Sequence, residues 1–326
     1  MSTQDRNLTR PRRAGAAGAA SRPAGVIGLG NLGLPYAQRL IGAGFPVVGF
    51  DLRAERLAAL AEAGGRAALD AAEVGHAADP VILSLPTAAA FAAVTAELAG
   101  SLDAGRVVVD TSTLTVADKL AARELLAARG ATLIDAAVST TPQALLEGRL
   151  VLFASGDERA FASARPALEA FAGEIHFVGE FGNAARLKLV CNLLVAIHNA
   201  AAAEAMALLE ATGLDPLLAH RVIAGGVASS RVWERRGAMM LAGDYQDGSF
   251  AYRIATHDAP MIDALCREAG AFTPLFQLAT QLHRAGVAIG LERYDTASLV
   301  ELYRSLRAAP GGPPEPADPS ATRGGT

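Results

Sequence analysis

Two polar side chains lie four residues apart in the most apolar long stretch of the chain, residues 186–209. They belong to Lys188 and Asn192. In a helix, residues at this spacing lie on the same face, so the ammonium and the amide can point at one small ligand. Burial among apolar neighbours such as Leu189 and Val190 would lower the pKa of the lysine and suit it to proton transfer. Taken alone, the pair is better explained by a lysine that reaches solvent at a helix start and a structural asparagine.

A glycine pattern near the start of the folded chain is typical of a phosphate-binding turn. Gly28, Gly30 and Gly33 follow a short apolar run and precede a helical segment. Such glycines permit a tight turn, close approach of a pyrophosphate and close packing of helix on strand, while the helix N-terminus faces the negative charge. A glycine-rich turn without a ligand is the alternative. The predicted cofactor contacts in this turn are Gly28, Leu29, Gly30, Asn31, Leu32 and Gly33.

A carboxylate at the end of the second predicted strand bears on the choice of cofactor. Asp51 lies 18 residues after Gly33, where a carboxylate accepts hydrogen bonds from the adenosine ribose hydroxyls. This placement favours NAD over NADP. Arg53 follows two residues later and could meet a 2′-phosphate, so NADP stays open.

Two further strand ends carry polar or turn-forming residues, in the stretches "SLPT" at 84–87 and "DTST" at 110–113. In a doubly wound sheet, ligands bind outside the carboxyl ends of the strands. We therefore predict that Leu85, Pro86, Ser112 and Thr113 contact the cofactor, with the substrate as the alternative ligand of the two hydroxyl residues. The two hydroxyl residues are equally suited to cap the helix that follows.

The elements that must position these residues alternate from Ala24 onward. Short β-rich runs alternate with helical Ala/Leu-rich segments, which predicts βαβ units and a mostly parallel sheet of the doubly wound Rossmann type. After about Gly182 the strand signals end, which predicts an all-α second domain joined through a long central helix. The predicted strands are residues 24–30, 46–51, 80–86, 106–113, 131–139 and 150–156. The predicted domains are a disordered arm at 1–23, a dinucleotide-binding domain at 24–181, a helical domain for substrate and oligomer contacts at 182–308 with its interdomain helix at 182–212, and a disordered tail at 309–326.

Composition and residue spacing argue against several classes of protein. The net charge of -4 and the pI near 5.9 give no basic footprint for nucleic acid. Cys191 and Cys266 lie far apart, and the histidines lack metal-ligand spacing, so we expect no disulfide and no metal. The first residues lack the apolar core of a secretory signal, although a transit peptide stays open. His198 and Glu204 argue against a membrane span in the apolar stretch. The two cysteines, far apart and without a C-x-x-C partner, fit buried thiols in a reducing compartment, so we expect a cytoplasmic protein.

The ordered motifs resemble those of the β-hydroxyacid dehydrogenase family, which includes 3-hydroxyisobutyrate, tartronate-semialdehyde and L-threonate dehydrogenases. The resemblance covers residues 24–308, and the threonate branch is the most similar. It rests on the glycine motif, "SLPT", "DTST", Asp135-Ala-Ala-Val-Ser139 followed by "EGRL", the run from Gly182 to Lys188 and Asn192, "IHNAAAAEAMALLEATGLDP", and Asp258.

The resemblance implies roles for individual residues. Lys188 matches the catalytic lysine, and Asn192 matches the asparagine that holds the reacting oxygen. Ser139 matches a serine that helps to bind the substrate carboxylate, but Thr140 and Thr141 replace two glycines of the family. Threonines restrict the backbone and add hydroxyls, so either these hydroxyls hold the carboxylate or the substrate differs.

A second departure from the family lies near the predicted cofactor. His257 stands where the family usually has a lysine, beside Asp258, and both residues are predicted cofactor contacts. His257 is either a substitute for that lysine or an ordinary surface residue.

The resemblance implies an NAD-dependent oxidoreductase that transfers a hydride between nicotinamide and a small hydroxy acid, either threonate-like or 3-hydroxyisobutyrate-like. The expected assembly is a homodimer or homotetramer, without nucleic acid or membrane partners. A related reductase of an uncharged carbonyl or an imine is one alternative. A non-catalytic NAD(H)-binding sensor is the other.

Overall fold

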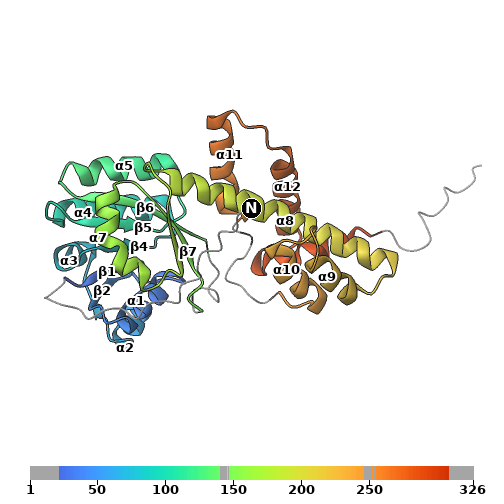
Figure 1. The fold of residues 1–326 in the computed structure, drawn as a ribbon, viewed down its shortest axis with the longest axis horizontal. Coiled ribbons are helices and arrows are strands. Elements are labelled where there is room, and N and C mark those ends of the chain that lie inside the picture. Colours follow the sequence, from blue (N-terminus) through green and yellow to red (C-terminus); the bar gives the residue numbers. More distant parts are fainter. Residues whose placement is uncertain (1–21, 140–144, 146, 246–251, 253, 308–326) are drawn as a thin grey trace, which may run out of the picture. The chain divides into compact units, whose positions relative to one another are not determined.

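The computed structural model describes residues 22–139, 145, 147–245, 252 and 254–307. Most of the predicted arm, the predicted tail, Thr140 and Thr141 lie outside these residues. The chain forms two compact units (Figure 1). Unit 1 runs to Leu193 and includes Pro260–Ala271, whereas unit 2 comprises Leu194–Ala259 and the chain from Phe272 onward.

Unit 1 is built around one eight-stranded sheet with the order β3-β2-β1-β4-β5-β6-β7-β8. The pairs are parallel except for β6 and β7, which are antiparallel. The strands are β1 (Ala24–Ile27), β2 (Val47–Phe50), β3 (Arg66–Ala67), β4 (Val81–Leu83), β5 (Val107–Asp110), β6 (Thr132–Ser139), β7 (Val151–Ser155) and β8 (Glu174–Phe177). The predicted doubly wound, mostly parallel sheet is confirmed.

Helices cover both faces of this sheet. One apolar cluster joins the sheet to α1 (Gly33–Gly42), α2 (Ala54–Glu62) and α7 (Glu158–Glu169). A second cluster joins it to α3 (Ala71–Ala77), α4 (Ala88–Ser101) and α5 (Val116–Ala127). Strands buried on both faces read as continuous Val, Ile and Leu runs, which is why the central strands are visible in the sequence.

Two strands were missed by the sequence prediction. β3 has only two residues, and both are exposed. β8 reads Glu-Ile-His-Phe with exposed residues alternating, as expected of an edge strand. Neither carries the buried apolar run that marks the interior strands.

Unit 2 is helical, as predicted for the C-terminal part. The central helix α8 (Asn183–Thr212) begins in unit 1 and continues into unit 2. Among the described residues it is the one helix long and apolar enough to cross a membrane, and 44% of its most apolar window is buried inside the protein. The other elements of unit 2 are α9 (Pro216–Ala224), α10 (Arg231–Ala242), the π-helical turn η2 (Ile254–Asp258), α12 (Pro274–Ala288), the 3-10 turns η3 (Leu291–Arg293) and η4 (Thr296–Leu299), and α13 (Val300–Ser305). Between η2 and α12 lies α11 (Ala259–Ala269), which belongs to unit 1 from Pro260 onward.

A buried polar contact fixes α8 within unit 2. The Asn199 amide donates to the backbone oxygen of Thr296 at 2.8 Å and lies 3.3 Å from Nε2 of His283. Burial lowers the pKa of His283 to about 4, so this imidazole is neutral at neutral pH. Asn199 therefore has a structural role in unit 2.

Candidate functional site

The glycine turn between β1 and α1 has little room for side chains at two of its three glycines. A Cβ on Gly28, where φ is +86°, would lie 2.3 Å from the backbone oxygen of Ser84. A Cβ on Gly33 would lie 1.8 Å from the backbone oxygen of Gly28. At Gly30 the nearest atom outside its chain neighbours is Nη2 of Arg53, at 3.9 Å. The backbone at Gly30 is therefore open, which fits the close approach of a pyrophosphate.

Asp51 follows β2 and is tied to this turn. Its Oδ2 accepts a hydrogen bond from the backbone N–H of Leu29 at 2.8 Å. Its Oδ1 accepts from the backbone N–H of Arg53 at 3.0 Å and from the Arg53 guanidinium at 3.2 Å. Partial burial acts to raise the pKa of Asp51, but these hydrogen bonds outweigh it and lower the pKa below its usual value. The carboxylate is ionised and retains acceptor capacity for ribose hydroxyls.

The strand ends after β4 and β5 are bonded to each other. The Ser112 hydroxyl is buried and accepts a hydrogen bond from the backbone N–H of Leu85 at 2.9 Å. The alternative prediction that Ser112 or Thr113 caps the next helix is wrong, because the cap of α5 is Thr115. Pro86 is exposed and Thr113 is half-buried, so both reach the surface at this edge of the sheet.

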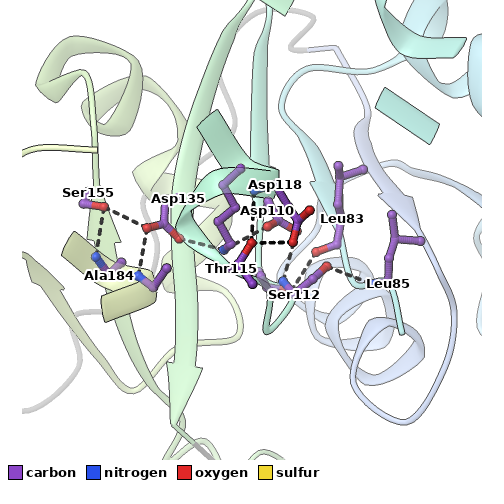
Figure 2. Close-up of polar contacts among 12 residues, drawn as sticks. Leu83, Leu85, Asp110, Ser112, Thr115, Asp118, Asp135, Ser155 and Ala184 are labelled. Atoms are coloured by element: carbon purple, nitrogen blue, oxygen red, sulfur yellow. Dashed lines mark hydrogen bonds and ion pairs between the residues drawn. The ribbon is translucent and has the colours of Figure 1, made fainter. Parts of the chain in front are cut away.

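A charged cluster lies at the centre of the sheet (Figure 2). Asp110 on β5 and Asp135 on β6 are register partners on neighbouring strands. Lys119 on α5 places Nζ 2.9 Å from Asp110 Oδ2 and 2.7 Å from Asp135 Oδ1, and all three side chains are fully buried. Burial alone would lower the pKa of Lys119, but the two carboxylates reverse this and hold the pKa above its usual value. Lys119 is a protonated, structural lysine.

The cluster continues to the start of α8. Ser155 is the register partner of Asp135 on β7, and its hydroxyl donates to Asp135 Oδ2 at 3.1 Å. The backbone N–H of Ala184 donates to Ser155 Oγ at 3.1 Å, and that of Ala185 donates to Asp135 Oδ2 at 2.8 Å. Figure 2 shows this chain of contacts from Ala184 through Ser155 to Asp135. The first turn of α8 is thereby bonded to the buried cluster.

The predicted acid/base pair lies just beyond these contacts. Lys188 and Asn192 are both half-buried and lie in the same long helix, α8. Of the neighbours expected to shield the lysine, Leu189 is buried, whereas Val190 is 47% exposed and therefore contradicts that expectation. Ser139, at the end of β6, is half-buried.

Comparisons with known proteins place this geometry in a family. Residues 23–179 match the family described as the NAD-binding domain of 6-phosphogluconate dehydrogenase. Residues 182–303 match the one described as NAD-binding of NADP-dependent 3-hydroxyisobutyrate dehydrogenase. The chain is similar to L-threonate dehydrogenase of Cupriavidus necator, with 32% identity over 88% of this chain and 97% of the relative. The chain belongs to the β-hydroxyacid dehydrogenase family.

Other members of the β-hydroxyacid dehydrogenases agree with this placement. The 2-(hydroxymethyl)glutarate dehydrogenase of Eubacterium barkeri is 30% identical over 86% of this chain and 95% of its own. The solved 3-hydroxyisobutyrate dehydrogenase of Mycobacterium tuberculosis has a TM-score of 0.81 and 26% identity, covering 87% of this chain and all of that one. This β-hydroxyacid dehydrogenase is an NAD(P)-dependent oxidoreductase of hydroxy acids.

One pair of predicted cofactor residues lies in the other unit of the dehydrogenase. His257 and Asp258 end the π-helical turn η2 in unit 2. Nδ1 of His257 lies 2.8 Å from Oδ1 of Asp258, so these side chains are bonded to each other. Their predicted contact with the cofactor stays a prediction.

The buried cluster of Lys119, Asp110 and Asp135 was missed by the sequence prediction for this β-hydroxyacid dehydrogenase. The rarity of lysine in the sequence was a signal that could have found it. Lys119 and Lys188 are the only 2 lysines in the chain's full sequence, beside 27 arginines. An arginine side chain does not lose its proton and has a bulky planar head, so a position that retains lysine in such a chain calls for the smaller ammonium or for deprotonation.

Proposed function

We propose that this enzyme oxidises a small hydroxy acid with Lys188 as the general acid/base. The observation that carries the proposal is the place of Lys188 and Asn192 in α8. They lie directly after a helix start that is hydrogen-bonded to the sheet of the dinucleotide-binding unit. At i and i+4 the two side chains share a helix face.

The chain's own residues handle the proton. Bound NAD supplies the nicotinamide that takes the hydride from the alcohol carbon. The neutral amine of Lys188 accepts the hydroxyl proton as the carbon–oxygen double bond forms, and it returns the proton in the direction of reduction. Asn192 donates a hydrogen bond to the reacting oxygen and restricts its orientation.

The proposed substrate carries a carboxylate beside its hydroxyl group. L-Threonate comes first, with 3-hydroxyisobutyrate next, because both names occur among the similar proteins. Ser139 would donate its hydroxyl to the carboxylate. The departure at Thr140 and Thr141 lies outside the described residues, and we propose that their hydroxyls take part in the same contact.

NAD is the proposed preferred cofactor. The ionised Asp51 lies at the end of β2, where it would accept hydrogen bonds from the ribose hydroxyls and repel a 2′-phosphate. Arg53 is paired with this carboxylate through its Nε, which leaves its outer nitrogens available for a phosphate and explains how NADP could also bind. Leu85, Pro86, Ser112 and Thr113 would contact the cofactor at the neighbouring strand ends.

We further propose that the enzyme is a cytoplasmic homodimer or homotetramer. The described residues of α9 include no buried side chain, although the helix is rich in apolar residues. Its exposed apolar residues are Leu217 at 56%, Leu218 at 52% and Val222 at 67%. An apolar helix surface of this kind is typical of a contact between subunits.

Replacement of Lys188 tests the proposal. Lys188→Ala and the charge-preserving Lys188→Arg should both lose about 10²–10⁴-fold in kcat, because neither side chain can exchange the proton. NADH affinity, measured by fluorescence titration, should be unchanged. Wild-type turnover in either variant would contradict the acid/base role.

The substrate is tested with a panel offered with NAD and with NADP. It contains L-threonate, 3-hydroxyisobutyrate and isobutanol, and isobutanol is the control that lacks the carboxylate of 3-hydroxyisobutyrate. We expect turnover only with the acids. Equal rates for isobutanol and 3-hydroxyisobutyrate would contradict the carboxylate contact and leave the role of Lys188 standing.

A further inference from the structure

The buried row formed by Asp110, Asp135 and Ser155 crosses three neighbouring strands at one level. The three residues are successive register partners on β5, β6 and β7, and each is fully buried. Two carboxylates so placed repel each other, and Lys119 compensates only one of the two charges. The row therefore keeps an excess of negative charge within the sheet.

The first turn of α8 faces this excess charge. The backbone N–H groups at a helix start carry partial positive charge and have no partner within the helix. Two of them are bonded to the row, from Ala184 to Ser155 and from Ala185 to Asp135. Because Asp135 Oδ2 accepts from both Ser155 and Ala185, the row fixes the axial position and the rotation of the helix start.

We propose that Asp135 and Ser155 are positioning residues for Lys188, because they hold the turn from which its side chain extends. The inference rests on the proposed role of Lys188. Lys188 comes three residues after Ala185, which is less than one turn, and a helical side chain leans back over the preceding turn.

The same row also sets the opposite side of the site. Two residues after Asp110 the chain reaches Ser112, whose backbone N–H donates to Asp110 at 3.0 Å. Four residues after Asp135 it reaches Ser139, at the end of β6. A shift of α8 against the row therefore changes the placement of Lys188 relative to both strand ends. A misplacement of about 1 Å can reduce a rate about 10²-fold.

Ser155→Ala is the test, because it removes one hydroxyl and leaves the three charged side chains in place. We expect kcat with L-threonate and NAD, or with the panel acid that the wild type oxidises fastest, to fall about 10-fold or more. The KM for NAD should stay within about twofold, since the hydrogen bonds that tie Asp51 to the glycine turn and to Arg53 do not involve the Ser155 hydroxyl. With substrate deuterated at the oxidised carbon, the isotope effect on kcat should be at least as large as in the wild type, because the chemical step is the one slowed.

Ser101→Ala is the matched control. Ser101 is a buried serine of the same unit, and its hydroxyl donates to Glu97 and Leu98 of its own helix. It should keep the wild-type kcat. Wild-type kcat in Ser155→Ala, an equal loss in both serine variants, or a smaller isotope effect would each overturn the inference.

Asp135→Asn provides a second measurement. Its single side-chain oxygen cannot serve Lys119, Ser155 and Ala185 together, so kcat should fall further than in Ser155→Ala. If this variant does not fold, Ser155→Ala decides the matter by itself. An inactive Lys188→Ala with an unaffected Ser155→Ala would remove this inference and leave the proposed function intact, whereas an active Lys188→Ala would remove the proposed function first.

Discussion

The two lysines of the chain differ in how deeply their side chains are buried. Lys119 is fully buried between two carboxylates at 2.9 and 2.7 Å. Lys188 is half-buried near the start of α8. Burial acts to lower the pKa of Lys119, yet its partners reverse the effect. The comparison teaches that depth of burial alone does not identify a catalytic lysine, because the carboxylates beside it decide whether it can lose its proton.

Removal of each lysine should separate stability from catalysis. Lys119→Met leaves two fully buried carboxylates in register without a cation, so the free energy of unfolding should fall by about 3–5 kcal/mol. Lys188→Met changes a half-buried position and should cost less than about 1 kcal/mol. Urea unfolding of both variants measures the difference. Equal losses would break the distinction between the two lysines.

The stability of the protein at high pH offers a second measurement of Lys119. The pKa of Lys119 in the folded protein lies above its ordinary value of 10.5. Between these two values the unfolded chain has lost the proton and the folded protein retains it, so stability falls as pH rises above about 10.5. The free energy of unfolding, measured with urea at pH 9.5 and at pH 11.5, should be lower at the higher pH. This loss should be smaller in Lys119→Met than in the wild type, by up to about 1.4 kcal/mol per pH unit.

Tyrosines also titrate in this pH range, but they contribute equally to the wild type and to Lys119→Met. Burial raises the pKa of Tyr252 and of Tyr303 to about 12, and this acts on stability with the same sign as Lys119. The tyrosines are present in both proteins. An identical pH slope in the wild type and in Lys119→Met would show that Lys119 is not held protonated by the fold.

The exposed ion pair between Arg53 and Asp51 should contribute much less to stability than the buried contacts of Lys119. Arg53 pairs with Asp51 at 3.2 Å, but its side chain is 49% exposed, so Arg53→Gln should change stability by less than about 0.5 kcal/mol. Its effect should appear in cofactor choice. The kcat/KM for NADP should fall about tenfold or more relative to that for NAD, as one charge-assisted hydrogen bond to a phosphate is lost. A ratio that does not change would exclude contact between Arg53 and the 2′-phosphate.

Sequence reasoning succeeded where the signal is local. The interior strands are continuous apolar runs, and the glycine turn, together with Asp51, follows a fixed spacing after the first strand. These features depend on neighbours within one βαβ unit. The two-residue β3 and the edge strand β8 lack such a signal, since the pairing partner rather than the segment itself defines them.

The buried row and its contact with Lys119 could not be predicted, because the residues that bond are distant in sequence. Asp135 accepts hydrogen bonds from Lys119, 16 residues away, and from the backbone N–H of Ala185, 50 residues away. The alternative prediction that Ser112 or Thr113 caps α5 is wrong for a related reason. Ser112 is bonded to Leu85, 27 residues away, and only the fold reveals that its hydroxyl is engaged.

The enclosure of Lys119 has a practical consequence for chemical labelling. Acylating reagents attack neutral, accessible amines, and Lys119 is neither neutral nor accessible in the folded protein. The chain has 2 lysines and 27 arginines, so Lys188 is the remaining lysine that such a reagent can modify. An acylating reagent should therefore modify one lysine side chain, that of the proposed catalytic residue, and the amino terminus is the second amine that it can reach.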